Sequence, residues 1–152
     1  MADIHARLAE LGLTLPAVSP PVASYVPAVR TGNYVYVSGQ LPFVDGALPA
    51  TGKVGAEVSP EHAKELAARC ALNALAVIDD LVGLGAVVKI VKVTGFVASA
   101  PGFTGQPGVI NGASELFGEL FGEAGRHARS AVGTAELPLG TPVEVEVIAE
   151  VT

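Results

Sequence analysis

The chain has few of the residues that build redox and metal sites. Of its 152 residues, one is cysteine, three are histidine and none is tryptophan. A single cysteine excludes an intrachain disulfide, and no group of His and Cys has the spacing of metal ligands. We therefore expect no cofactor. Cys70 lies among Ala and Leu, which predicts an inert core residue.

Charge is also sparse. Only 16% of the residues are charged, and nine Lys and Arg against fifteen Asp and Glu give a formal net charge of −6. Proteins that bind a phosphate backbone usually cluster their basic residues, whereas the nine here are scattered. A nucleic-acid partner is therefore not expected.

Long apolar runs are missing, although half of the residues are hydrophobic. No run reaches the roughly 18 residues that span a bilayer, and the first twelve residues lack the basic and apolar regions of a secretory signal. We expect a soluble, cytoplasmic protein without a membrane partner. High apolar content with little charge also predicts a surface for self-association.

Residues 1–20 predict an N-terminal helix opened by Asp3 and an extended linker, with three prolines between residues 15 and 21. Residues 21–152 predict a single domain. Ser59-Pro60-Glu61 supplies an N-cap, a proline in the first turn and an early acid. A helix should run from there to Gly83 or Gly85, with a buried stripe of Leu66, Leu72, Leu75, Ile78 and Leu81.

The other elements follow from β-rich runs and their boundaries. We predict a hairpin from 25–29 and 34–38, a strand at 89–97, a loop at 99–108, a helix over about 109–123 with Phe117, Leu120 and Phe121 inward, and strands at 130–137 and 142–151. This order predicts an α+β two-layer sandwich with a mixed or antiparallel sheet and two main helices.

The two faces of the predicted sheet differ in character. In the strand 143–147, alternation places the valines on one face and Glu144 and Glu146 on the other. In Tyr34 to Ser38, the tyrosines and the serine share a face opposite Val35 and Val37. This second face is aromatic and partly polar, as at a subunit interface that contains a polar site.

Three stretches together resemble the RidA (YjgF) family, whose members are also called endoribonuclease L-PSP. They are GNYVYVSGQLP at 32–42, VINGA at 109–113, and ARS at 128–130 with the LP and VEVE that follow at 137–146. The resemblance covers about residues 20–151. It implies a chorismate-mutase-like fold assembled as a homotrimer, with clefts between subunits. It also implies hydrolysis of reactive enamines and imines, such as 2-aminoacrylate and 2-iminopropanoate, to 2-keto acids and ammonia.

The same resemblance assigns the two central site residues. Arg129 matches the arginine that binds the substrate carboxylate, and a guanidinium suits this task because it can form two parallel hydrogen bonds. The alternative is a structural arginine paired with Glu144 or Glu146. Glu144 matches the glutamate that holds or polarises the attacking water, and its alternative is an exposed strand residue.

Four further positions carry over as substrate-binding residues. Tyr25 matches a tyrosine at the mouth of the cleft, and Ser38 a serine that can fix the substrate or its amine. Gly39 would allow close approach, although a simple turn glycine looks the same. Asn111 is either a ligand contact or a helix cap.

The chain departs from the family at several points, which predicts a divergent branch with an altered pocket. Ala131 stands where the best-characterised branch has a cysteine, and Ala23-Ser24 replaces the usual Gly-Pro. His127 can tune the site, but a solvated loop histidine is the favoured interpretation. Two other functions stay open: a non-catalytic binding module for small carboxylates, and an endoribonuclease or translation inhibitor, which the acidic charge disfavours.

Overall fold

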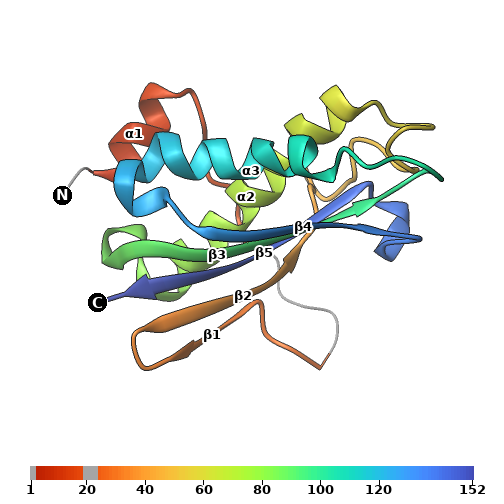
Figure 1. Ribbon diagram of the computed structural model, residues 1–152. Coiled ribbons are helices and arrows are strands. Elements are labelled where there is room, and N and C mark those ends of the chain that lie inside the picture. The colour runs from red at the N-terminus through yellow and green to blue at the C-terminus, as the bar shows by residue number, and fades with distance from the viewer. Residues whose placement is uncertain (1–2, 19–23) are drawn as a thin grey trace.

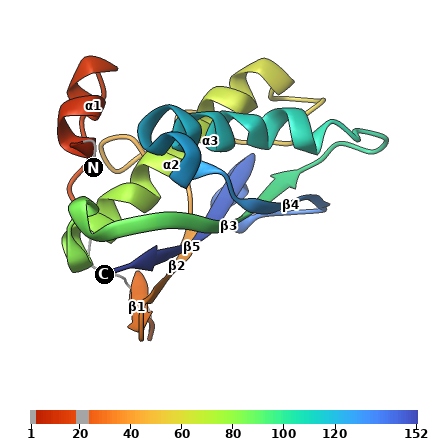
Figure 2. The same ribbon diagram turned by 60° about the vertical axis from the view of Figure 1, so that its left-hand side comes forward.

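The computed structural model describes residues 3–18 and 24–152, in which one twisted sheet carries all the helices on one face (Figures 1 and 2). The helices are α1 (Ile4–Glu10), α2 (Pro60–Val82) and α3 (Gln106–Phe121), with short 3-10 turns at Leu84–Ala86, Gly122–Gly125 and Pro138–Gly140. The strands are β1 (Ala28–Thr31), β2 (Tyr34–Gln40), β3 (Val87–Ala98), β4 (Ala128–Thr134) and β5 (Val143–Val151).

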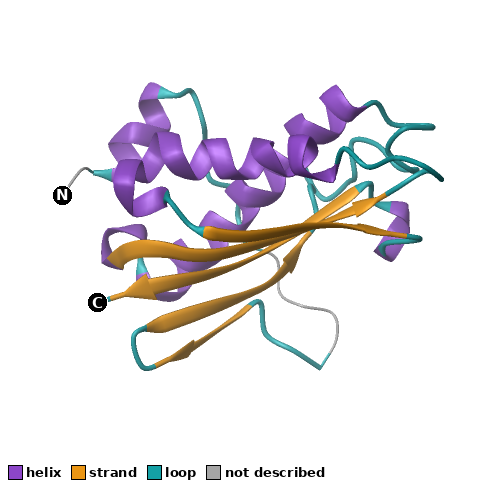
Figure 3. Cartoon of the chain, viewed as in Figure 1, coloured by secondary structure: helices purple, strands orange, loops and turns teal. Residues whose placement is uncertain are grey.

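The strand order in the sheet is β1-β2-β5-β3-β4 (Figure 3). The pairs β1/β2, β2/β5 and β5/β3 are antiparallel, while β3 and β4 run parallel because α3 connects them as a crossover. The predicted α+β class with a mixed sheet is confirmed. The crossover leaves β4 at one edge of the sheet, beside α3.

Helix α2 begins and ends as predicted. The Ser59 hydroxyl accepts a hydrogen bond from the backbone N–H of His62 at 3.1 Å, and Gly83 ends the helix with φ +81°. Leu66, Leu72, Leu75 and Ile78 are buried. The prediction for Leu81 is wrong, since its exposed fraction is 45% and burial in α2 stops at Ile78.

Three predicted boundaries are corrected. Strand β1 starts at Ala28 and not at Tyr25, because Pro27 has no N–H to donate and uses its carbonyl instead, accepting from the Ser38 N–H at 2.9 Å. Helix α3 starts at Gln106, with Pro107 in its first turn, so the preceding loop ends at Gly105. Strand β4 ends at Thr134, where its partner β3 also ends.

The two sheet faces are as predicted. Val143, Val145 and Val147 are buried on the face of β5 that α2 covers, while Glu146 on the opposite face is exposed. On that face Tyr34 and Tyr36 are 43% and 47% exposed. We call this side, which none of the described helices covers, the open face (Figure 2).

The N-terminal helix packs on the helical layer. Asp3 caps α1 by accepting from the backbone N–H groups of His5 and Ala6, and the Arg7 Nε donates to the Glu119 carbonyl of α3 at 3.1 Å. The predicted linker at 15–21 lies partly outside the described residues.

Across residues 3–18 and 24–152, no helix has the length and apolar character needed to cross a membrane.

Candidate functional site

Arg129 lies on β4 at the sheet edge and is held by α3. Its Nη1 donates to Asn111 Oδ1 at 2.7 Å and to Ser114 Oγ at 3.2 Å. Both acceptors are neutral, and no carboxylate of the described residues is within ion-pair distance of the guanidinium. The predicted alternative, a pair with Glu144 or Glu146, is therefore wrong. A half-buried guanidinium without a counter-ion is suited to binding an anion.

Asn111 is in the second turn of α3 and does not cap the helix, whose N-cap is Gly105. Its side chain faces β4 because Asn111 and Ser114 are three residues apart and so lie on the same helix face. Helix α3 thus places two oxygen acceptors side by side against Arg129. The capping interpretation of Asn111 is excluded by this position.

His127 extends the same network and is not a solvated loop histidine. Its Nε2 is 2.9 Å from Ser114 Oγ, and its Nδ1 is 2.6 Å from the Gly125 carbonyl oxygen. The ring of buried Phe117 meets the imidazole edge to face, with ring centroids 5.9 Å apart. The interpretation of His127 as solvated is therefore wrong, since α3 and the Gly122–Gly125 turn enclose the ring.

Glu144 lies on β5 against Gly39 of β2. A Cβ at position 39 would overlap the Glu144 carboxylate, so glycine is required for the carboxylate to lie over this backbone. Burial, and the charge of Glu146 in second place, raise the pKa of the half-buried Glu144. The interpretation of Glu144 as an exposed strand residue does not fit this position.

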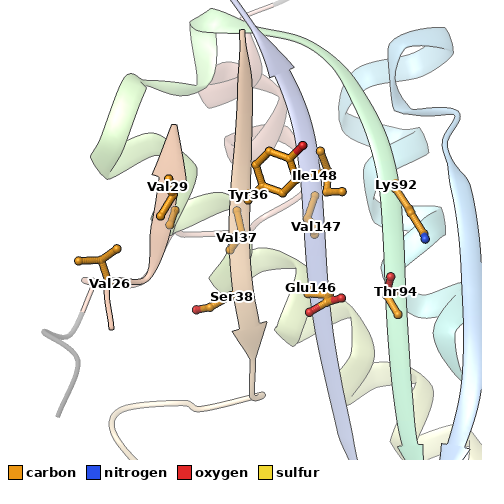
Figure 4. A pocket seen from close by; sticks show the side chains of 11 residues that line it. Val26, Val29, Tyr36, Val37, Ser38, Lys92, Thr94, Glu146, Val147 and Ile148 are labelled. Atoms are coloured by element: carbon orange, nitrogen blue, oxygen red, sulfur yellow. The ribbon is translucent and has the colours of Figure 1, made fainter. Parts of the chain in front are cut away.

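Ser38 directly precedes Gly39 on β2, and Tyr25 lies two residues before Pro27, which Ser38 contacts. The Ser38 hydroxyl donates to the Pro27 carbonyl at 3.0 Å, which fixes the chain just after Tyr25, and keeps its lone pairs as acceptors. Tyr25 itself is 56% exposed. Ser38 also lines a shallow depression of about 290 Å³ on the open face, together with Tyr36, Lys92, Thr94 and Glu146 (Figure 4).

The predicted site residues thus form two separate groups within one chain. Arg129 pairs with Val93 on one side of β3, whereas Glu144 pairs with Phe96 on the other side of that strand. Arg129 contacts α3 on the helical face, while Glu144 alternates with the buried valines and lies on the open face. A small substrate cannot contact both groups of a single protomer.

Ser114 is the site residue that the sequence reasoning missed. A serine three residues after Asn111 in a helix is a detectable signal, because that spacing puts both side chains on one face.

Cys70 is fully buried, and burial, followed by the charge of Glu144, raises the pKa of its thiol, as expected for an inert core residue. Among the residues that the structure describes, no cluster of three or more His, Cys, Asp or Glu could hold a metal ion.

The fold and these residues define a small α+β protein with a half-buried arginine at the sheet edge, held by Asn111 and Ser114. The family model described as endoribonuclease L-PSP matches residues 16–151. The chain therefore belongs to the endoribonuclease L-PSP family, also called RidA or YjgF, as the sequence resemblance predicted.

Two curated relatives illustrate the range of the family. The chain is 43% identical over 149 residues to Protein TCP17 of Trypanosoma cruzi, which covers 97% of this chain and 93% of that protein. It is 35% identical over 130 residues to the 2-iminobutanoate/2-iminopropanoate deaminase of Escherichia coli K12, covering 84% and 88%.

Two solved structures resemble this chain to different degrees. The Agrobacterium tumefaciens protein Atu1372, described as having unknown function, superimposes with a TM-score of 0.91 at 46% identity, covering 98% of this chain and 93% of that one. E. coli TdcF, solved with bound serine, gives a TM-score of 0.64 at 25% identity, covering 91% and 96%. The chain is thus structurally closer to Atu1372 than to TdcF.

Proposed function

We propose that this protein hydrolyses reactive imines and enamines of the 2-iminopropanoate and 2-aminoacrylate type to 2-keto acids and ammonia. The observation that carries the proposal is the Arg129 guanidinium, which is half-buried, held in place by Asn111 and Ser114, and without a carboxylate partner among the described residues. Every substrate of this class carries a carboxylate, which Arg129 would bind through two hydrogen bonds.

Relatives support this choice of substrate. A homologue at 35% identity is named for 2-iminobutanoate and 2-iminopropanoate deamination. TdcF binds serine, whose carboxylate is the same chemical group that Arg129 would hold. The predicted location of the protein in the cytoplasm stays a prediction.

The proposed reaction needs only water and the residues of the chain. Glu144 accepts a proton from a water molecule as the water oxygen bonds to the imine carbon, and it passes this proton to the nitrogen, which gives a neutral carbinolamine. Glu144 then takes the proton of the carbinolamine hydroxyl and delivers it to the amino nitrogen as the C–N bond breaks, the carbonyl forms and ammonia leaves. The raised pKa of Glu144 suits a group that must take and release a proton near neutral pH.

We also propose that the protein acts as a homotrimer in which each cleft combines residues of two neighbouring subunits. Arg129 and Asn111 would come from one subunit, and Ser38, Gly39 and Glu144 from the open face of the next, with Tyr25 at the mouth. The separation of these two groups within one chain supports this arrangement. The open face supports it as well, because Tyr34, Tyr36 and Val132 leave large apolar surfaces exposed there.

The test measures keto-acid release while a second enzyme generates 2-iminopropanoate. Wild-type protein should accelerate release, and Arg129→Ala should lower kcat/KM about 100-fold, as for the loss of charged hydrogen bonds. Arg126→Ala is the matched control, since Arg126 is an exposed arginine nearby whose partner is Glu123.

The outcomes separate the candidate functions. Release no faster with the wild-type protein than without it would contradict the proposal. If calorimetry then shows 2-oxobutanoate binding that Arg129→Ala abolishes, the protein is a carboxylate-binding module. Cleavage of single-stranded RNA that disappears in Arg129→Ala would instead support the endoribonuclease activity.

A further inference from the structure

The arginine site contains two residues to which the family resemblance gives no role, Ser114 and His127. Together they connect the guanidinium to the main chain at Gly125 through three consecutive hydrogen bonds. Each bond in this series constrains the next. The series therefore determines how Arg129 can present itself to a ligand.

The direction of the hydrogen bonds follows from the Gly125 carbonyl. A carbonyl oxygen only accepts, so the His127 Nδ1, 2.6 Å away, must carry a hydrogen and donate it. In the neutral imidazole, Nε2 is then an acceptor and receives the hydroxyl hydrogen of Ser114 at 2.9 Å. The Ser114 oxygen lone pairs are thereby turned to accept from Arg129 Nη1 at 3.2 Å.

The remaining donors of Arg129 decide how a carboxylate can bind. A guanidinium has five N–H groups, two of them on Nη1. Asn111 Oδ1 and Ser114 Oγ are two acceptors for these two Nη1 hydrogens. Neither Nε nor Nη2 has a hydrogen-bond partner among the described residues, and Nε–H and one Nη2–H lie parallel along one side of the guanidinium.

We propose that Ser114 and His127 are positioning residues that fix Arg129 so that a substrate carboxylate binds side-on, through Nε–H and Nη2–H. This inference rests on the proposed role of Arg129 as the carboxylate-binding residue. Without the Ser114 hydroxyl, Nη1 loses one of its two acceptors. The guanidinium can then reorient by rotation about the side-chain bonds that lead to it. The carboxylate must then order the arginine as it binds, which weakens binding.

The test measures the dissociation constant of 2-oxobutanoate by calorimetry, together with KM and kcat for the imine. Ser114→Ala and His127→Phe should each raise the dissociation constant and KM about 3- to 10-fold, the range for one lost hydrogen bond, with kcat changed less than about twofold. The double variant should bind 2-oxobutanoate no more weakly than either single variant, because the two residues act in series.

Two control variants isolate the hydroxyl. Ser114→Thr keeps the hydroxyl and should restore binding. Thr104→Ala removes an exposed hydroxyl just before α3, away from the open face, and should match the wild type. A purely structural role would lower the folded fraction and the apparent kcat while leaving KM and the dissociation constant unchanged.

The outcomes distinguish this inference from the proposed function. If Arg129→Ala weakens 2-oxobutanoate binding but Ser114→Ala binds as the wild type does, the positioning role is wrong and the function stands. Equal weakening by Ser114→Thr and Ser114→Ala would also overturn it, because the hydroxyl would then not matter. If Arg129→Ala itself changes neither binding nor hydrolysis, the proposed function fails.

Discussion

At the residue scale, the Glu144 carboxylate depends on the absence of a side chain at Gly39. The carboxylate lies where a Cβ would be, and its half-buried setting beside Glu146 raises its pKa above the ordinary 4.5. The same two features suit proton transfer and carry a cost to folding. An acid whose pKa is higher in the folded state binds protons more tightly there than in the unfolded chain.

This linkage predicts how stability depends on pH. As the pH rises from about 4.5 through the raised folded pKa, the folded state loses the advantage of its protonated Glu144, so this residue lowers the free energy of unfolding. Glu144→Gln removes the effect. We expect the variant and the wild type to have equal stability below pH 4, and the variant to be the more stable at pH 7, by urea unfolding at fixed protein concentration.

The stability difference between the two proteins, and not either curve alone, is the relevant quantity. Other carboxylates affect stability in the opposite direction. The backbone N–H of Lys53 lowers the pKa of Glu57, and Glu57 therefore stabilises the fold at pH values above its own ordinary pKa. Their contributions cancel in the comparison. A difference that shrinks as the pH rises would contradict the environment described for Glu144.

At the residue scale, the sequence named candidate site residues but not the contacts between them. Arg129, Glu144, Ser38 and Gly39 were named because the motifs that contain them resemble those of the family. Ser114 and the environment of His127 were not, because both depend on how α3 packs against β4. Such a contact joins residues from different elements, and no local pattern reports it.

At the element scale, the position of α3 is set by its close contact with α2. A Cβ at Gly112 would overlap the main-chain carbonyl of Lys64 in α2, so the helices approach too closely for a side chain there. Gly112 follows Asn111 directly, and the contact that seats the helix is therefore adjacent to the Arg129 site. The sequence predicted this helix. Its first residue, and its contact with α2, depend on tertiary packing and were not predicted.

Two glycines of α3 offer a matched comparison. Gly112→Ala should destabilise the protein by about 1–3 kcal/mol, because the added methyl group meets main-chain atoms that cannot easily move. Gly118→Ala has open space around the new methyl group and should stabilise the helix by about 0.5–1 kcal/mol. Thermal or urea unfolding measures both, and a Gly112→Ala variant as stable as Gly118→Ala would contradict the described contact.

Strand boundaries were less predictable than strand faces. The alternation of valine and glutamate in β5 determines the face of each side chain, because the period of a strand is two. The ends of β1 and β4 depend instead on Pro27 and on where β3 stops. Leu81 shows the same limit in a helix, since periodicity cannot tell where the covering layer ends.

At the scale of the whole molecule, a single protomer holds two incomplete halves of the proposed site. Arg129 of β4 contacts Asn111 of α3 at one edge of the sheet, while Glu144, Gly39 and Ser38 lie on β5 and β2. The uncovered, partly apolar face of the sheet favours assembly independently of the family. If three subunits form a ring, each cleft can take one half from each neighbour.

Subunit complementation tests this central claim most directly. Arg129→Ala and Glu144→Gln chains, each inactive alone, would be co-expressed with different tags, and trimers containing both would be confirmed by mass. In a ring with clefts shared between neighbours, a cleft is intact when a Glu144→Gln chain supplies Arg129 and an Arg129→Ala chain supplies Glu144. Random mixing of the two chains makes about a quarter of all clefts intact. We predict imine hydrolysis at about a quarter of the wild-type rate. Mixed trimers with no activity above that of the separate variants would contradict the account.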